Sequence, residues 1–211
     1  MGMRVACSPT KMITDVIYTA TISSTPLRLR ESRLVADLLL RGLHGDDWKH
    51  ALVDENILQS GSAIGVVRSA NIIRARLEPL GADLWTMVRD GDQHLATQAA
   101  FAGAVRHSRL LGDFMDITLR EQRALFADHL EPRMWGEYLE GCRGRDPEMP
   151  FWSEATVAKL RSIVFSMLAE AGYLRDTRSL KVQNVFLEDA LAALLRERSE
   201  RYVLRCMEVH S

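Results

Sequence analysis

Apolar residues at helical spacing run through most of this 211-residue chain and constrain its fold more than any other feature. In the segment predicted as a long helix over 63–80, an apolar residue recurs every three or four positions. The members of this inward-facing stripe are Val66, Ala70, Ile73, Leu77 and Leu80. The same spacing predicts further helices over about 32–43, 47–55, 82–89, 93–111, 118–130, 132–142, 153–171 and 187–195. We therefore expect a mostly α, compact multi-helix protein.

The strongest break in this pattern lies at 144–150, where two prolines and a glycine fall within seven residues. This break predicts a boundary between two lobes. We expect a flexible N-terminal tail over 1–17, which shows little pattern, an N-terminal helical lobe over 18–145 and a C-terminal helical lobe over 146–211.

The last 40 residues mix two kinds of pattern. Short strands are predicted over 182–187 and 202–209, on either side of the helix predicted over 187–195. A helix, an extended turn, a helix and an extended segment are compatible with a small winged-helix-like β element near the C-terminus. Such modules can place a helix in a DNA groove. The same order is also common in helix packing with no partner, so the sequence leaves both interpretations open.

Residues that carry chemistry form no catalytic or metal-binding pattern. The sequence has no H-E-x-x-H zinc motif, no phosphate-binding glycine loop and no G-x-S-x-G nucleophile motif. The six histidines have no paired spacing, and the three cysteines Cys7, Cys142 and Cys206 include no C-x-x-C pair. We therefore expect a protein that is not an enzyme, that binds no cofactor or metal, and whose thiols are reduced.

Hydropathy predicts a cytoplasmic protein without membrane contact. No uninterrupted apolar run approaches the ~20 residues that span a bilayer. The first residues also lack the apolar core of a signal peptide.

Charge restricts how this chain can bind nucleic acid. The 27 basic and 28 acidic residues give a net charge of -1, so contacts to DNA would have to come from local basic patches. The candidate DNA-binding residues are Arg28, Arg30 and Arg33; Arg68, Arg74 and Arg76; and Lys159 and Arg161 with Arg175, Arg178 and Lys181. Further basic residues cluster at Arg143 and Arg145, and at Arg196, Arg198, Arg201 and Arg205. The competing interpretation of every cluster is a solvated helix face with ion pairs four residues apart.

Two of these clusters can be distinguished by position. On the predicted helix over 63–80, Arg74 and Arg76 flank the apolar stripe on opposite sides and Arg68 points away, so they form no single strip. The loop over 175–181 is more suggestive, because three basic residues there accompany one acid, Asp176, and two hydroxyl residues. Arginines and small hydroxyl side chains are typical phosphate contacts. In a winged helix, this loop would be the wing.

Several stretches of the chain, in their order, resemble one family. They are residues 29–36, 47–49, 55–59, 74–77, 107–114, 151–153 and 168–174. Together they resemble the BrxA family of bacterial BREX phage-defence systems across roughly 18–195. The resemblance implies a non-enzymatic accessory component, an all-helical fold related to the antitermination factor NusB, and binding to double-stranded DNA and to other BREX proteins. It supplies no catalytic residue and no binding motif.

Two functional hypotheses follow. The first is a DNA-binding accessory component, with RNA as a ligand not excluded and the oligomeric state open. The second is a protein-interaction scaffold within the BREX complex that binds no nucleic acid, for which an exposed apolar patch would be the working surface. The candidate patch is Met134, Trp135, Tyr138, Phe151 and Trp152, although core packing would also explain these aromatic residues.

Overall fold

The computed structural model describes residues 18–24, 26–58 and 62–209, and these residues fold mostly into helices. The expectation of a mostly α protein is therefore confirmed. The predicted tail over 1–17 lies outside the described residues. The elements are the 3₁₀ turns η1 (Ala20–Ser24) and η2 (Glu78–Leu80), the π-helical segment η3 (Phe114–Leu119), and α1 (Leu29–Leu40), α2 (Gly45–Val53), α3 (Ala63–Leu77), α4 (Gly81–Asp90), α5 (Gln93–His107), α6 (Arg109–Asp113), α7 (Arg120–Ala124), α8 (Met134–Arg145), α9 (Glu154–Glu170), α10 (Asp189–Glu197) and α11 (Arg201–Met207).

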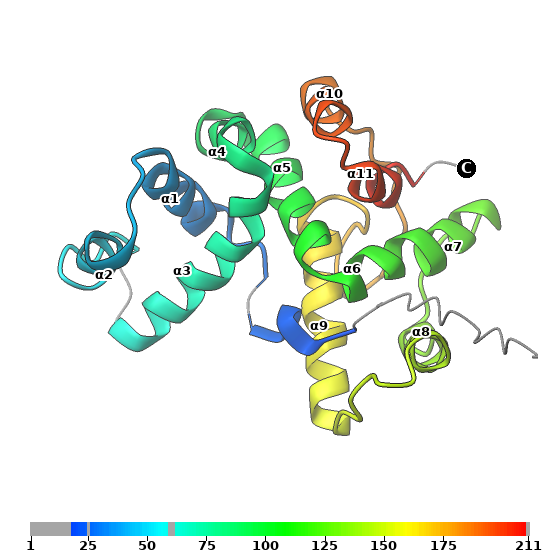
Figure 1. Cartoon of the computed structure of the whole chain (residues 1–211). Coiled ribbons are helices and arrows are strands. Elements are labelled where there is room, and N and C mark those ends of the chain that lie inside the picture. Colours follow the sequence, from blue (N-terminus) through cyan, green and yellow to red (C-terminus); the bar gives the residue numbers. More distant parts are fainter. Residues whose placement is uncertain (1–17, 25, 59–61, 210–211) are drawn as a thin grey trace, which may run out of the picture.

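Helix α5 is the centre of the core. Figure 1 shows it running between α1 to α4 on one side and α6, α9 and α11 on the other. Nearly every residue over 96–105 is buried, and most are alanines, whose small side chains let neighbouring helices approach closely. At Gly103 the approach is too close for a larger residue, because a Cβ there would lie 2.7 Å from the carbonyl oxygen of Arg76 on α3.

One of the predicted helices is broken in the structure. The segment predicted over 93–111 divides at Ser108, whose backbone is extended and whose side chain accepts a hydrogen bond from the amide of Leu111. Ser108 therefore caps a new helix, α6, and α6 continues into η3 and α7.

The two predicted C-terminal strands do not form. The strand predicted over 202–209 is wrong, because most of it lies in α11, where Val203, Cys206 and Met207 share one buried face at helical spacing. Over 182–187 the backbone is held differently: the side chain of Gln98 donates to the carbonyl of Phe186 and accepts from the amide of Glu188. The described residues contain no strand; they contain two isolated antiparallel bridges, His129 with Lys181 and Leu174 with Val182.

The first described residues are tied into the protein by buried polar groups. Tyr18 is fully buried, and its hydroxyl donates to Asp113 at 2.7 Å and accepts from the Arg145 guanidinium at 2.9 Å. Tyr202 on α11 donates to the other oxygen of Asp113, also at 2.7 Å. Burial raises the pKa of the Tyr18 hydroxyl well above its ordinary value, so Tyr18 stays a donor. The amide of Tyr18 also donates to Asp146, directly after α8.

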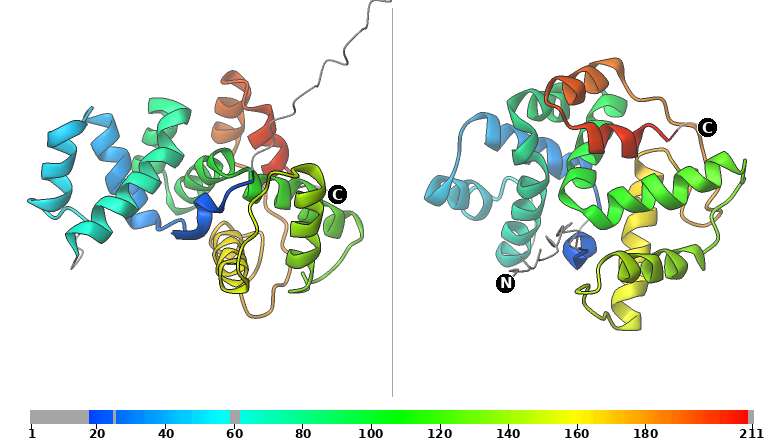
Figure 2. Two further views of the ribbon diagram at one scale, coloured as in Figure 1. Left: turned by 60° about the horizontal axis from the view of Figure 1, so that its bottom comes forward. Right: turned by 45° about the vertical axis from the view of Figure 1, so that its right-hand side comes forward.

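The core is continuous across position 146. η1 packs on α9, and buried residues from Tyr18 to Val209 belong to one cluster. The two views in Figure 2 show η1 beside α9, distant from it in sequence. The division into lobes at 145 and 146 stays a prediction. Within the described ranges, no helix is long and apolar enough to cross a membrane, and no group of three or more histidine, cysteine or acidic side chains is placed to hold a metal ion.

Replacing Asp113 with alanine removes the acceptor shared by the buried hydroxyl of Tyr18 and the partly buried hydroxyl of Tyr202. We expect Asp113→Ala to lower the free energy of unfolding by about 3 kcal/mol, as for other buried charged hydrogen-bond networks. Urea unfolding followed by circular dichroism measures this. The control is Glu140→Ala on the exposed side of α8, which should change it by less than about 0.5 kcal/mol. Equal urea midpoints for the two variants would contradict the assigned role of Asp113.

Thiol reactivity gives a second prediction. Cys142 and Cys206 are fully buried, and burial raises the pKa of the Cys206 thiol to about 12 and that of Cys142 above its ordinary value. Because the thiolate is the reactive form, neither should react quickly at pH 8. With Cys7, which lies outside the described residues, changed to serine, we expect Ellman's reagent to titrate no thiol in the folded protein and two in guanidinium chloride. A fast-reacting thiol in the folded variant would show that one of these sites opens.

Candidate nucleic-acid interface

The N-terminal basic cluster is engaged in local structure. Arg33 donates to the carbonyl oxygens of Arg89, Gly91 and Asp92, at 2.6, 2.8 and 3.3 Å. Its guanidinium thus caps the C-terminal end of α4, where carbonyls lack helical partners. Arg28 pairs with Glu31 at 3.4 Å. Of this cluster, Arg33 therefore holds α1 against α4.

The three arginines on α3 point in different directions. Arg74 pairs with Glu78 at 2.8 Å and lies over the Trp48 ring at 4.9 Å. Arg76 is only 3% exposed and donates to the carbonyl of Pro26. Burial lowers the pKa of Arg76 to about 10, which leaves it charged at neutral pH. Arg68 is exposed. The structure does not bring these candidates together, in agreement with their helical positions.

Lys159 and Arg161 are two residues apart on α9 and so point away from one another. Arg161 lines a pocket of about 640 Å³ between α8 and α9, together with Arg143, whose guanidinium lies over the Phe151 ring at 5.4 Å. Lys159 is exposed on another side of α9.

The loop over 175–181 is a tight turn held by its own backbone and by Asp176. The Arg175 amide donates to the Lys181 carbonyl at 2.8 Å. The Asp176 carboxylate accepts from the amides of Arg178 and Ser179, at 2.9 and 2.6 Å, and from the Ser179 hydroxyl at 2.9 Å. These hydrogen bonds, together with the Arg175 guanidinium, hold the pKa of Asp176 well below its usual range.

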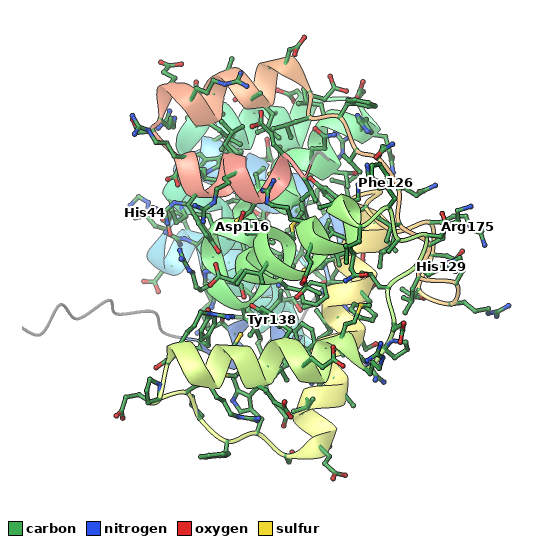
Figure 3. The ribbon with its side chains drawn as sticks, turned by 90° about the vertical axis from the view of Figure 1, so that its right-hand side faces the viewer. His44, Asp116, Phe126, His129, Tyr138 and Arg175 are labelled. Carbon is green, nitrogen blue, oxygen red and sulfur yellow. The ribbon has the colours of Figure 1, made fainter. Side chains whose placement is uncertain are left out.

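A second segment lies against this loop. The Leu130 amide donates to the Leu180 carbonyl at 3.0 Å, and the Val182 amide donates to the Asp128 carbonyl at 2.8 Å. Figure 3 shows Phe126, His129 and Arg175 at the same edge of the molecule. We call residues 125–129 and 175–181 together the paired-loop edge.

The paired-loop edge combines exposed cations with an exposed aromatic ring. Arg175 pairs with Asp176 at 3.0 Å, whereas Arg178 and Lys181 are exposed and their side chains have no carboxylate partner among the described residues. Phe126 is 84% exposed and has a left-handed backbone with φ of +55°. Unpaired cations contact phosphates, and exposed aromatic rings stack on bases. This arrangement can bind a nucleic-acid backbone.

The 125–129 segment of this edge was not predicted from the sequence, because the pattern there favoured a helix over 118–130. α7 ends at Ala124 instead. One signal was present: Pro132 disfavours helical backbone at Glu131, so a helix ending earlier was already favoured.

The aromatic residues around the predicted boundary belong largely to the core. Trp135 and Tyr138 are buried and contact the Phe114 ring at centroid distances of 5.3 and 5.1 Å. Met134 and Trp152 are partly buried, and Phe151 is 90% exposed. The described residues therefore present no broad aromatic patch at this place.

Fold and surface together define a small all-helical protein with one continuous core and cations on tightly held loops. A solved crystal structure of a Magnetospirillum magneticum protein superposes on the chain with a TM-score of 0.85; it is 44% identical, and the match covers 91% of this chain and 98% of that one. The BREX protein BrxA of Paramagnetospirillum magneticum is 44% identical over 91% of this chain and 96% of its own length. The BREX protein BrxA of Escherichia coli O9:H4 is 29% identical over 92% of this chain and 91% of its own length. The BrxA family model matches residues 16–199, and the chain therefore belongs to the BrxA family.

Removing the Asp176 carboxylate should loosen the 175–181 turn without unfolding the protein. We expect amide exchange at Arg178 and Ser179 to quicken at least tenfold in Asp176→Ala, because their acceptor is removed, while the melting temperature barely changes. The depressed pKa implies that the wild-type turn keeps these bonds below pH 4 and loses them only as pH falls through that lower pKa. Hydrogen exchange read by NMR measures this. Asp128→Ala, whose exposed carboxylate is outside the turn, is the control, and equal exchange in both variants would contradict the assignment.

Proposed function

We propose that this protein is a non-enzymatic accessory component of a BREX phage-defence system that binds double-stranded DNA through the paired-loop edge. The observation that carries the proposal is the pair Arg178 and Lys181, which are exposed and unpaired with carboxylates on a turn fixed by Asp176. A fixed turn lowers the entropy cost when its side chains order on phosphates. Membership of the BrxA family supports the placement in BREX.

The arrangement around this edge supports a winged-helix-like interpretation as part of the proposal. Along the chain, His129 is followed by α8, α9, Leu174 and the 175–181 turn. After the turn, Lys181 forms a β-bridge with His129, and Val182 forms one with Leu174. In Figure 1, α8 is seen nearly end-on while α9 runs down the picture, so the two helices cross steeply. In this interpretation α9 enters a DNA groove. The 175–181 turn acts as the wing, and Lys159 and Arg161 lie on the groove helix α9.

Local charge, not net charge, would drive this binding. The chain carries a net charge of -1, so long-range attraction to DNA is weak and contacts must come from the edge itself. Counterions released from the contacted phosphates would make the affinity fall as salt rises.

Charge alone does not choose between DNA and RNA. The relation to NusB that the resemblance implies remains part of the proposal and keeps RNA as the competing ligand. A wing and groove helix are built for the wide major groove of B-form DNA, whereas the major groove of an RNA duplex is too deep and narrow for side chains to read. We therefore propose the DNA duplex as the ligand.

Alanine at two cations tests the proposal. We expect Arg178→Ala with Lys181→Ala to weaken binding to a DNA duplex about tenfold at about 50 mM salt, and to reduce the salt slope by about 0.9 for each phosphate that the variant no longer neutralises. Fluorescence anisotropy across a salt series measures both. The matched control removes two exposed arginines elsewhere, Arg41→Ala with Arg201→Ala, and should leave the slope unchanged.

Three outcomes would overturn the use of this edge, the binding itself or the choice of DNA as the ligand. Equal weakening in the test and control variants would show that binding does not use the paired-loop edge. If the protein shows no salt-dependent binding to DNA, and no binding to a matched RNA duplex or single strand, the result would favour the alternative function, a scaffold that binds no nucleic acid. Tighter binding to the RNA duplex than to the DNA duplex would reject DNA as the ligand.

A further inference from the structure

Helix α3 carries two apolar faces, and only one of them is fully buried in the core. Val66, Ala70, Ile73 and Leu77 are all at most 2% exposed. A second set follows on the opposite side of the helix at the spacing i, i+3, i+8 and i+11. Its members are Ile64, Val67, Ile72 and Ala75. Ile64 is 85% exposed, which is unusual for a large branched aliphatic side chain.

This second face forms the floor of an open groove of about 850 Å³. Lys49 and Val53 of α2 form one wall, and Thr21 and His107 lie on the other side. The apolar set over 64–75 covers 11 helical steps, or roughly 16 Å, which is three helical turns. The groove therefore has the length of a short helix.

The rim of the groove is positive. Lys49 and Arg68 are exposed, and neither has a hydrogen bond or ion pair among the described residues. No acidic residue lines the groove in the described part of the chain. Asn71 accepts from the Trp48 indole at 3.1 Å, which leaves its own amide hydrogens as donors. Burial and the charge of Arg76 lower the pKa of His107, so this imidazole is neutral at pH 7.

Charge and chemistry together select the occupant. A second copy related by a two-fold axis would place Lys49 and Arg68 against the same cations, which repel. A nucleic acid would satisfy the cations but would leave the apolar floor covered by polar backbone. A helix with an apolar stripe and acidic flanks matches both features at once, as in other helix-in-groove complexes.

We propose that the α2–α3 groove binds an amphipathic helix of a partner protein, with acidic residues flanking the apolar stripe of that helix. The apolar stripe would cover Ile64, Val67 and Ile72, and its carboxylates would pair with Lys49 and Arg68. This surface is separate from the paired-loop edge and does not depend on nucleic-acid binding.

Two stapled helical peptides of three to four turns test the proposal. Both carry the same leucine stripe; one has glutamates on its flanks and the other has lysines at the same positions. With the full chain at low salt, we expect calorimetry to give at least tenfold tighter binding for the acidic peptide. Amide shifts in an NMR titration should concentrate on α2 and α3.

Charge reversal sharpens the test. In Lys49→Glu with Arg68→Glu, we expect the preference to invert, so that the lysine peptide binds more tightly. Ile64→Ser should weaken both peptides at least fivefold and, because Ile64 is exposed, should leave the melting temperature unchanged. Arg41→Glu with Arg201→Glu, at the end of α1 and on α11, is the matched control and should keep the wild-type preference.

Several results would overturn the proposal. Equal affinity for the two peptides, or a preference that charge reversal does not change, would exclude charge-selective docking in this groove. A dimer in sedimentation experiments that Ile64→Ser dissociates would assign the face to a second copy. If neither peptide binds the wild-type protein and Lys49→Glu with Arg68→Glu weakens DNA binding, the groove would be assigned to nucleic acid.

Discussion

The buried carboxylate of Asp113 is the constraint on which the rest of the structure depends. It accepts from Tyr18, Tyr202 and Arg109, and so joins the first described residues, α6 and α11. The chain enters the π-helical segment η3 directly after it, and there Asp116 pairs with Arg120 and with Arg205 of α11. Such segments are rare within helices. Here the segment leads into α7, which is directed toward 125–129, so the position of the paired-loop edge depends on a carboxylate far from that edge.

The arginines divide into those that build the protein and those that remain available. Arg33 and Arg76 donate to backbone carbonyls, and Arg145 donates to a tyrosine hydroxyl. Arg120 similarly reaches the carbonyls of Arg205 and Glu208. A guanidinium suits this role because it stays charged and presents several donors in one plane. Many of the remaining charges are cancelled locally by ion pairs. Unpaired cations persist at a few places, and this is how a chain with a net charge of -1 can have positive surfaces.

Helical spacing was enough to predict most of the fold, because most of the longer helices bury one continuous stripe; α5, which is buried nearly all round, is the exception. The strand prediction over 202–209 failed because it relied on β-prone residue types. The buried face of α11 repeats at helical spacing, and packing of that face decides the structure. Half of the candidate site was visible as the 175–181 loop. The other half was not, because His129 meets Lys181 only across 52 positions of sequence, a pairing that no local pattern encodes. Burial of Arg76 was equally hidden, since it depends on the Pro26 carbonyl brought in by the N-terminal segment.

The two proposed surfaces lie on different sides of α5. In Figure 1, α2 and α3 are at the left, while the end of α7 reaches the right, beyond α9. Between them stands a close-packed core in which α5 is buried along most of its length, and such cores resist deformation. A partner helix in the groove and a duplex on the paired-loop edge would therefore not compete, and each would be held at a fixed position relative to the other. Through two such surfaces, a small protein would fix where a larger partner meets nucleic acid. The unpaired cations on both surfaces are the residues through which that positioning would be set.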